Sequence, residues 1–320
     1  MIEAIGLIAL GLVLLAGGGE ALLRGAVALA SLLRLPPAII GLTVVAAGTS
    51  FPELSVSVLA SLKEQPDIAV GNVVGSNIFT VTLVLGVCAL VRPLAITGNS
   101  IRLEYPVLAI VTLMTLAVAQ DGTINALDGL LFVSIYVLFT TYMVTLVREQ
   151  VGPEEAGELV AGVQSLVARP RWLPTLAWLV GGVAVLGLGA TLTVNGAIGL
   201  AEMAGLSERV IGLTIVAAGT SLPEVVATLV STVRGRDDVA IGNVIGSNIF
   251  NILGILGLSS LFSPLPVHAS IIGVDNLWMM GTTLLLFPLM FTRRRIDRWE
   301  GALLFAAYVV YTASLLARPA

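Results

Sequence analysis

A stretch of forty residues occurs twice in this chain. Residues 41–80, GLTVVAAGTSFPELSVSVLASLKEQPDIAVGNVVGSNIFT, return 171 positions later as residues 212–251, and 21 of the 40 aligned positions are identical without a gap. Each copy carries one glutamate, Glu53 or Glu224, inside a stretch apolar enough to cross a bilayer. An ionisable residue at membrane depth indicates a functional site by default. The two copies therefore predict one site built from both halves of the chain.

The composition assigns the chain to the membrane. It is 57% hydrophobic and 11% charged, with a mean hydropathy of +1.01, whereas globular chains carry roughly 25% charged residues. Since a span needs about 20 mostly apolar residues and no alternating strands of a barrel are present, we expect an all-α membrane protein with ten transmembrane helices. The predicted spans are 3–23, 37–62, 69–91, 103–120, 126–147, 173–200, 209–233, 239–262, 270–291 and 299–317.

These spans divide into two repeats of five. Residues 1–147 form the first repeat, residues 148–172 a polar cytoplasmic linker, and residues 173–320 the second repeat. Because five is odd, the second repeat is expected to enter the membrane in the opposite sense to the first. Transporters use such inverted-topology repeats to hold their substrate near the bilayer midplane.

The basic residues predict the orientation. If the N-terminus faces one side, that side receives three of the 16 basic residues, and the other side receives the remaining 13. The positive-inside rule then places both termini outside and the basic loops in the cytoplasm of a plasma or inner membrane. The three are Lys63, Arg209 and Arg318; the 13 are Arg24, Arg34, Arg92, Arg102, Arg148, Arg169, Arg171, Arg234, Arg236, Arg293, Arg294, Arg295 and Arg298.

The first motif of each copy, GTSFPE or GTSLPE, gathers oxygen ligands. Pro52 lacks an N–H for the carbonyl of Gly48, so the helix should bend and free the carbonyls around residues 46–48. Thr49 and Ser50 precede Glu53 by four and three residues and share its helical face. The second copy places Thr220 and Ser221 before Glu224 in the same way. Such an oxygen set suits hard cations such as Na⁺ and Ca²⁺. The alternative, a proline kink with hydroxyls bonded back to the helix, does not explain a buried glutamate occurring twice.

The second motif, GNVVGSNIF or GNVIGSNIF, combines glycine with polar side chains at helical spacing. Gly71 and Gly75 permit close helix approach. Three polar residues line one face in each copy: Asn72, Ser76 and Thr80 in the first, and Asn243, Ser247 and Asn251 in the second. For Asn72, Asn77, Asn243 and Asn248, hydrogen bonding between helices and cation ligation both remain open.

The two motif pairs at the same spacing resemble the α-repeats of the sodium/calcium exchanger family, within the cation/calcium exchanger superfamily. The resemblance implies that the first and sixth helices slide across a rigid core. It favours Ser76, Ser247 and Asn251 as ligands, while Thr80 keeps an oxygen with less reach than the usual asparagine or aspartate. The implied cation ligands are Glu53, Glu224, Thr49, Ser50, Thr220, Ser221, Ser76 and Ser247, with the carbonyls of Ala46 and Ala217.

We therefore expect a secondary active antiporter that exchanges Na⁺ for Ca²⁺ by alternating access. Two carboxylates balance one Ca²⁺ or two Na⁺, and a third Na⁺ leaves the loaded site at +1, consistent with electrogenic three-for-one exchange. Members resembling potassium-dependent exchangers carry aspartate where Asn251 stands, so K⁺ independence is expected.

The alternative is a proton-driven cation exchanger, because a buried glutamate without a cation can hold a proton. A passive channel suits a duplicated, inverted site less well. The chain is not expected to be an enzyme, since it contains neither Gly-x-Ser-x-Gly nor His-Glu-x-x-His.

No cofactor is expected besides the transported ions. The expected surroundings are membrane lipid, with no nucleic acid and no obligate protein partner. Glu20 and Arg24 are expected to form an interfacial ion pair at the end of the first helix, and the single histidine, His268, to lie at the surface. Asp128 and Asp275 each begin a helix and are expected to cap it or face water.

Overall fold

A computed structural model gives the structure of residues 2–33, 46–96, 100–150, 171–203, 210 and 212–317. The first half contains helices broken by short π-helical or 3₁₀ turns (labelled η) and two short strands. Its elements are α1 (Ile2–Leu33), α3 (Ala46–Thr49), α4 (Phe51–Leu62), α5 (Pro66–Phe79), η2 (Thr80–Val84), α6 (Leu85–Val91), β1 (Leu94–Ala95), η3 (Ser100–Glu104), α7 (Tyr105–Val118), η4 (Ala119–Asp121), β2 (Thr123–Ile124) and α8 (Ala126–Gln150).

The second half follows the same order. The π-helical turn that follows α5 begins at Thr80, and its counterpart begins at Asn251, 171 positions later. The elements of this half are α10 (Trp172–Met203), η5 (Gly212–Val216), α12 (Ala217–Thr220), α13 (Leu222–Val233), α14 (Asp237–Phe250), η6 (Asn251–Leu256), α15 (Gly257–Phe262), β3 (Leu265–Pro266), η7 (Ile271–Asp275), α16 (Asn276–Phe291), η8 (Thr292–Arg294), β4 (Arg295–Ile296) and α17 (Arg298–Leu316).

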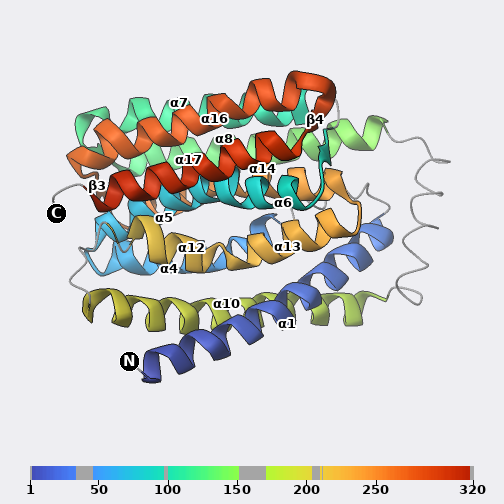
Figure 1. Cartoon of the computed structure of the whole chain (residues 1–320), viewed down its shortest axis with the longest axis horizontal. Helices are drawn as coiled ribbons and strands as arrows, with labels where there is room; N and C mark the ends of the chain where they lie inside the picture. The colour runs from blue at the N-terminus through green and yellow to red at the C-terminus, as the bar shows by residue number, and fades with distance from the viewer. Residues whose placement is uncertain are drawn as a thin grey trace.

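The helices lie in three layers (Figure 1). Helix α1 packs against α10 on one side of the molecule, and α7, α8, α16 and α17 lie on the other side. Between them run the helices that carry the repeated motifs. The segments Pro66–Val91 and Asp237–Phe262 form the centre of this layer, and they are 83% and 100% buried over their most apolar windows. The repeated sequence therefore supplies the core of the protein.

Two short antiparallel ribbons join the halves at opposite ends of the helical body (Figure 1). In one, β1 pairs with β4, with Leu94 opposite Ile296. In the other, β2 pairs with β3, with Thr123 opposite Pro266. Each ribbon contains one strand from each half, so the two halves are connected at both ends.

Within the described residues, seven helices are long and apolar enough to cross a membrane, or eight if the bent pair Leu213–Thr220 and Leu222–Val233 forms one span. The chain is thus a multi-pass, all-helical membrane protein. Of the other predicted spans, 3–23 lies within α1, and 37–62 begins in residues outside the described part. Most of the predicted linker, residues 151–170, also lies outside it. The predicted number of ten spans stays a prediction.

Candidate functional site

The helix that carries each glutamate is broken just before it. Ser50 lies between α3 and α4 with φ −83° and ψ 9°, and Ser221 lies between α12 and α13 with φ −80° and ψ 6°. In the second half the two segments meet at a bend of 51°. Pro52 and Pro223 occupy the first turns of the new helices, where proline needs no N–H partner. The predicted bend is confirmed in the second copy, and the first copy has the same break at the matching residue.

The two breaks bring the glutamates into one hydrogen-bonded group. The Ser50 hydroxyl donates to Oε1 of Glu224 at 2.7 Å, and the Ser221 hydroxyl donates to Oε1 of Glu53 at 2.8 Å. Each serine thus binds the carboxylate of the opposite half. The prediction that residues 41–80 and 212–251 build a common site agrees with this exchange of partners.

Each glutamate keeps one oxygen without a partner. Oε2 of Glu53 and Oε2 of Glu224 are buried and accept no hydrogen bond from the described residues. The two side chains are 0% and 1% exposed. Among the described residues, neither carboxylate forms an ion pair with lysine or arginine. Buried carboxylate oxygens without a countercharge are costly, so this pair is suited to bind a cation.

The threonines of the motif connect each break to an asparagine of the other half. Thr220 donates to Oδ1 of Asn72 at 3.0 Å, and Thr49 lies 3.5 Å from Oδ1 of Asn243. Asn72 in turn donates to the backbone carbonyl of Glu53 at 3.2 Å. Asn72 therefore positions the helix that carries Glu53, and helix-to-helix hydrogen bonding accounts for its side chain.

The expectation that the bend frees the carbonyls near its start is wrong for two residues. The carbonyl of Ala46 accepts the Ser50 N–H at 3.1 Å and the Thr49 hydroxyl at 3.2 Å. That of Ala217 accepts the Ser221 N–H at 3.0 Å and the Thr220 hydroxyl at 3.3 Å. The reason is that proline removes only the N–H of its own residue, so the preceding turn keeps its bonds.

Ser76 and Ser247 differ in what they contact. The Ser76 hydroxyl reaches across to the carbonyl of Ala217 at 3.4 Å, whereas the Ser247 hydroxyl donates to Val244 within its own helix at 3.1 Å. Both side chains are fully buried. Ser76 thus lies at the broken segment of the other half.

Thr80 and Asn251, at the starts of the two π-helical turns, also differ. Thr80 donates to the carbonyl of Ser76 at 2.8 Å and accepts from Nδ2 of Asn248 at 2.7 Å. Asn251 donates to Oδ1 of Asn77 at 3.0 Å, and its own Oδ1 is buried and has no partner among the described residues. Asn251 therefore offers a spare oxygen, while the Thr80 oxygen is already engaged twice.

Three residues of this network were not singled out from the sequence. Ser57 accepts from Asn72 at 3.0 Å, and Thr228 accepts from Asn243 at 3.0 Å. Each of these two follows a glutamate by four residues, and they occupy matching positions of the two copies, 171 residues apart. This match in the sequence could have identified them. The third, Met279, lies with its sulfur 3.7 Å from Nδ2 of Asn77. No sequence pattern pointed to it, since it is apolar and lies outside the repeated motifs.

The other polar residues lie away from this group. Glu20 and Arg24 form the expected ion pair at 2.8 Å, and His268 is exposed. Asn125 caps the start of α8, accepting the N–H groups of Leu127 and Asp128 at 2.8 and 3.3 Å, and Asp128 accepts the Asn125 N–H at 2.9 Å, so Asp128 takes part in the cap without being the capping residue. The expectation for Asp275 is wrong: it is 0% exposed, does not cap α16, and accepts from the Tyr311 hydroxyl at 3.4 Å.

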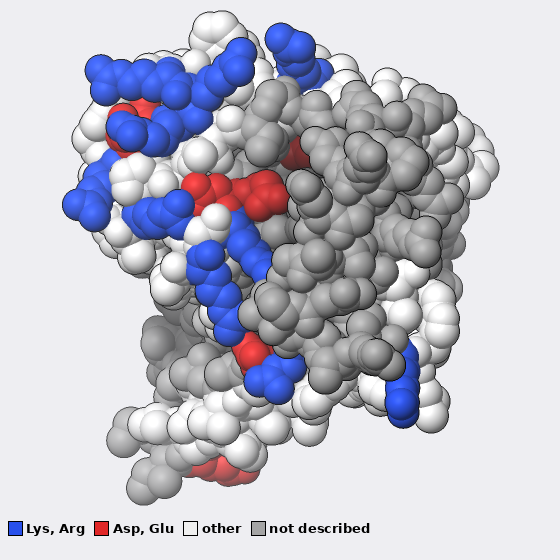
Figure 2. All heavy atoms as spheres, turned by 90° about the vertical axis from the view of Figure 1, so that its right-hand side faces the viewer, with Lys and Arg blue, Asp and Glu red and all other residues white. Residues whose placement is uncertain are grey.

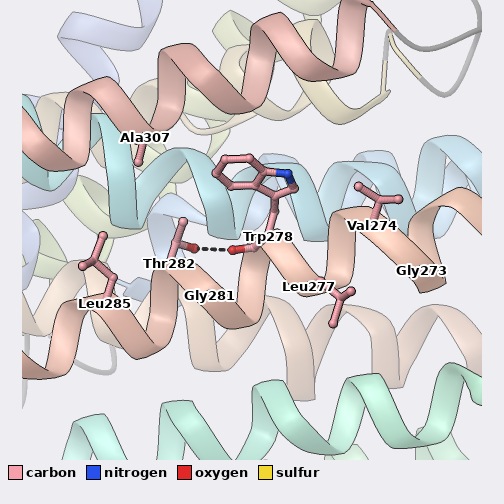
Figure 3. Close-up of a pocket in the computed structure, with 8 residues that line it drawn as sticks. All are labelled: Gly273, Val274, Leu277, Trp278, Gly281, Thr282, Leu285 and Ala307. Atoms are coloured by element: carbon pink, nitrogen blue, oxygen red, sulfur yellow. Dashed lines mark hydrogen bonds between the residues drawn. The ribbon is translucent and has the colours of Figure 1, made fainter.

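A pocket of about 400 Å³ lies at a different place, between α16 and α17 (Figure 3). Trp278, Leu277 and Leu285 of α16 line it, together with Ala307 of α17. The hydroxyl of Thr282 is bonded to the carbonyl of Trp278 in its own helix at 2.9 Å. The lining contains none of the predicted site residues, so this apolar pocket is separate from the carboxylate pair.

Comparison with known proteins covers nearly the whole chain. The family described as sodium/calcium exchanger protein matches residues 3–145 and 174–317. The putative antiporter CaxA of Alkalimonas amylolytica is 40% identical over 97% of this chain and 98% of its own. The sodium/calcium exchanger MaX1 of Methanosarcina acetivorans is 32% identical over 96% of each chain.

A solved structure has the same architecture. A structure of the sodium-calcium exchanger NCX_Mj, soaked with Na⁺ and Ca²⁺, superposes with a TM-score of 0.80 at 31% identity and covers 100% of both chains. The two parts matched by the family model each contain one GTS-x-PE motif and one GNV-x-GSNIF motif.

Proposed function

The chain belongs to the sodium/calcium exchanger family and is a cation/Ca²⁺ antiporter, and we propose that it exchanges about three Na⁺ for one Ca²⁺ without requiring K⁺. Exchangers of this family are transporters and need no cofactor beyond the ions they carry. The ions would bind alternately to one site, reached first from one side of the membrane and then from the other.

The observation that carries the proposal is the reciprocal pair of bonds between the halves. Ser50 holds one oxygen of Glu224, and Ser221 holds one oxygen of Glu53. Two buried carboxylates sharing a hydroxyl-lined site supply a formal charge of −2, which matches one Ca²⁺. Hard cations of this kind prefer oxygen ligands.

We assign the remaining ligand roles according to whether each oxygen is already engaged in hydrogen bonds. Asn251 has a buried free oxygen, and Ser76 and Thr49 lie within the same network. The carbonyls of Ala46 and Ala217 can join only by sharing an oxygen that already accepts hydrogen bonds. Thr220 and Ser247 are also assigned as ligands, on the resemblance of the motifs to the exchanger family. Thr80 is assigned a supporting role because its hydroxyl is fully engaged in hydrogen bonds.

The proposed transport cycle uses inverted repeats. The two halves would span the membrane in opposite senses, with both termini outside and the basic loops in the cytoplasm. Helices α1 and α10 pack together on one side of the motif-bearing layer. Their sliding across that layer would open the site to each side in turn, as alternating access requires.

The test is ⁴⁵Ca²⁺ uptake into proteoliposomes under an imposed gradient of Na⁺, K⁺ or H⁺. The proposal predicts uptake driven by an outward Na⁺ gradient alone, with no effect of removing K⁺. Uptake that needs a proton gradient and ignores Na⁺ would instead support the proton-driven alternative. An antiporter of either kind should slow in acid, because protons compete for the two carboxylates, so acid inhibition alone does not separate the two.

A further inference from the structure

Five arginines gather where the β1–β4 ribbon joins the ends of α6, α16 and α17. We call them the arginine ribbon: Arg92, Arg293, Arg294, Arg295 and Arg298. All five are exposed. The strand pairing places Ala95 opposite Arg295, and Arg298 donates to the carbonyl of Val91 at 3.4 Å. Residues some 200 positions apart are thus held in one surface patch.

The patch keeps a positive charge after its ion pairs are counted. Asp297 pairs with Arg295 at 2.7 Å and with Arg293 at 3.8 Å, and Asp237 lies 3.5 Å from Arg92. Glu300 is buried beside them and accepts the Asp297 N–H. Five arginines less these three carboxylates leave a formal charge of about +2. Figure 2 views this end of the molecule and shows basic side chains, in blue, clustered on it.

Two arginines of the patch adopt a backbone conformation that favours glycine. Arg293 and Arg294 have φ values of 58° and 49°, in the left-handed region. The corresponding turn of the first half, between α7 and β2, uses Gly122 with φ 85°. A non-glycine residue is disfavoured there, because its Cβ lies too close to the following carbonyl oxygen. The same turn is therefore made with glycine in one half and with two arginines in the other.

Apolar side chains flank the arginines. Phe291 ends α16 and is 65% exposed, and Trp299, in the first turn of α17, is 63% exposed. Tryptophan favours the membrane–water interface, which places the neighbouring arginines at the depth of lipid headgroups. A ligand that binds here would contact positive charge and apolar surface together. A phospholipid has an anionic headgroup and apolar chains and so matches both, whereas a free phosphate ion matches only the charge.

We propose that the arginine ribbon binds the headgroup of an anionic phospholipid. Guanidinium groups match phosphate oxygens by paired hydrogen bonds, and basic clusters just beyond a membrane-spanning helix attract anionic lipid. Arg294 forms no ion pair among the described residues, so it can contact the phosphate directly. This assignment does not depend on which ions the protein exchanges.

The test is thermal unfolding of the purified full chain in neutral detergent, titrated with phosphatidylglycerol or with phosphatidylcholine. Phosphatidylglycerol should raise the melting temperature at low concentration, and phosphatidylcholine should not. The double variant Arg293→Gly/Arg294→Gly should melt no lower than the wild type without lipid, because glycine relieves the backbone strain. It should need at least about tenfold more phosphatidylglycerol for the same shift, given about 1 kcal/mol per arginine near anionic lipid and tenfold per 1.4 kcal/mol.

Two matched variants isolate the cause. Arg293→Lys/Arg294→Lys keeps the charge and should retain most of the response, whereas Lys63→Gln removes an exposed charge elsewhere and should respond as the wild type does. An undiminished response in the double-glycine variant would overturn the proposal, as would equal shifts with the two lipids. Inorganic phosphate giving the same shift at the same concentration would identify a free-anion site and also overturn it.

Discussion

Thr80 and Asn251 occupy matching positions but present different chemistry to the site. Both begin a π-helical turn, a feature that often occurs at functional sites. The hydroxyl of Thr80 donates to Ser76 and accepts from Asn248, whereas the buried Oδ1 of Asn251 has no partner in the part of the chain that the structure describes. The repeat is therefore symmetric in its carboxylates and asymmetric at Thr80 and Asn251, one helical turn beyond Ser76 and Ser247.

This asymmetry predicts different effects of substitution. Thr80→Val should lower the free energy of unfolding by about 1 kcal/mol through lost hydrogen bonds and change Ca²⁺ affinity little. Asn251→Ala should weaken Ca²⁺ binding at least about tenfold, because it removes an available oxygen. Equilibrium ⁴⁵Ca²⁺ binding and chemical denaturation measure the two quantities. A larger loss of affinity in Thr80→Val than in Asn251→Ala would show that the free oxygen is not a ligand.

The hydrogen-bonded group around the two glutamates was largely predictable because the sequence repeats its members. Glu53, Glu224 and the serines before them follow from a duplicated carboxylate next to a proline. The sequence did not predict that the carbonyls of Ala46 and Ala217 keep their hydrogen bonds, since the partners of a hydrogen-bond acceptor depend on the local backbone. It also did not predict that the Thr80 hydroxyl accepts a hydrogen bond from Asn248, because Asn248 comes from the other half of the chain.

At the scale of elements, close contact between the halves depends on glycine. A Cβ at Gly75 of α5 would lie 2.5 Å from the carbonyl oxygen of Leu213 and 2.8 Å from Cβ of Ala217. Both neighbours belong to the broken segment before Glu224. The two motif-bearing segments can therefore approach only with glycine at this position.

We predict that Gly75→Ala lowers stability by about 1–3 kcal/mol, the usual cost of overpacking, and reduces Ca²⁺ transport. Gly281→Ala is the matched control, since a Cβ there would meet nothing within 4 Å. It should raise stability by about 0.5–1 kcal/mol, because alanine is the better helix former. Thermal unfolding and ⁴⁵Ca²⁺ flux of both variants provide the comparison. Equal effects of the two substitutions would refute the close contact.

Features of the helices could be predicted from the sequence where their cause lies within a few residues. The breaks before Pro52 and Pro223 and the part that Asp128 takes in the cap of α8 follow from proline and side-chain chemistry within a few residues. The β1–β4 ribbon, the π-helical turns and the burial of Asp275 do not, because each depends on packing against distant segments. Asp275, for example, looks like a water-facing helix start in sequence, but its partner Tyr311 lies 36 residues away.

At the scale of the whole molecule, the proposed exchange moves charge. Three Na⁺ entering for one Ca²⁺ leaving carry one net positive charge inward, worth roughly 2.3 kcal/mol per 100 mV. An inside-negative potential should therefore speed Ca²⁺ extrusion, and removing K⁺ should leave the rate unchanged while Asn251 is neutral. Reversal potentials in proteoliposomes, with and without K⁺, measure both. Voltage-independent flux would rule out the three-for-one cycle, and a strict K⁺ requirement would contradict the role given to Asn251.

The central claim is that Glu53 and Glu224, one from each half, together form a single Ca²⁺ site. Equilibrium ⁴⁵Ca²⁺ binding to the purified protein tests it most directly, with Glu53→Gln, Glu224→Gln and the exposed control Glu20→Gln measured side by side. We predict one Ca²⁺ per wild-type chain, displaced cooperatively by Na⁺, and unchanged binding in Glu20→Gln. Each site variant should fold but bind at least about 100-fold more weakly, since removing one charge of a buried ionic group costs roughly 3–5 kcal/mol. Near-normal Ca²⁺ binding in either folded site variant would contradict the claim.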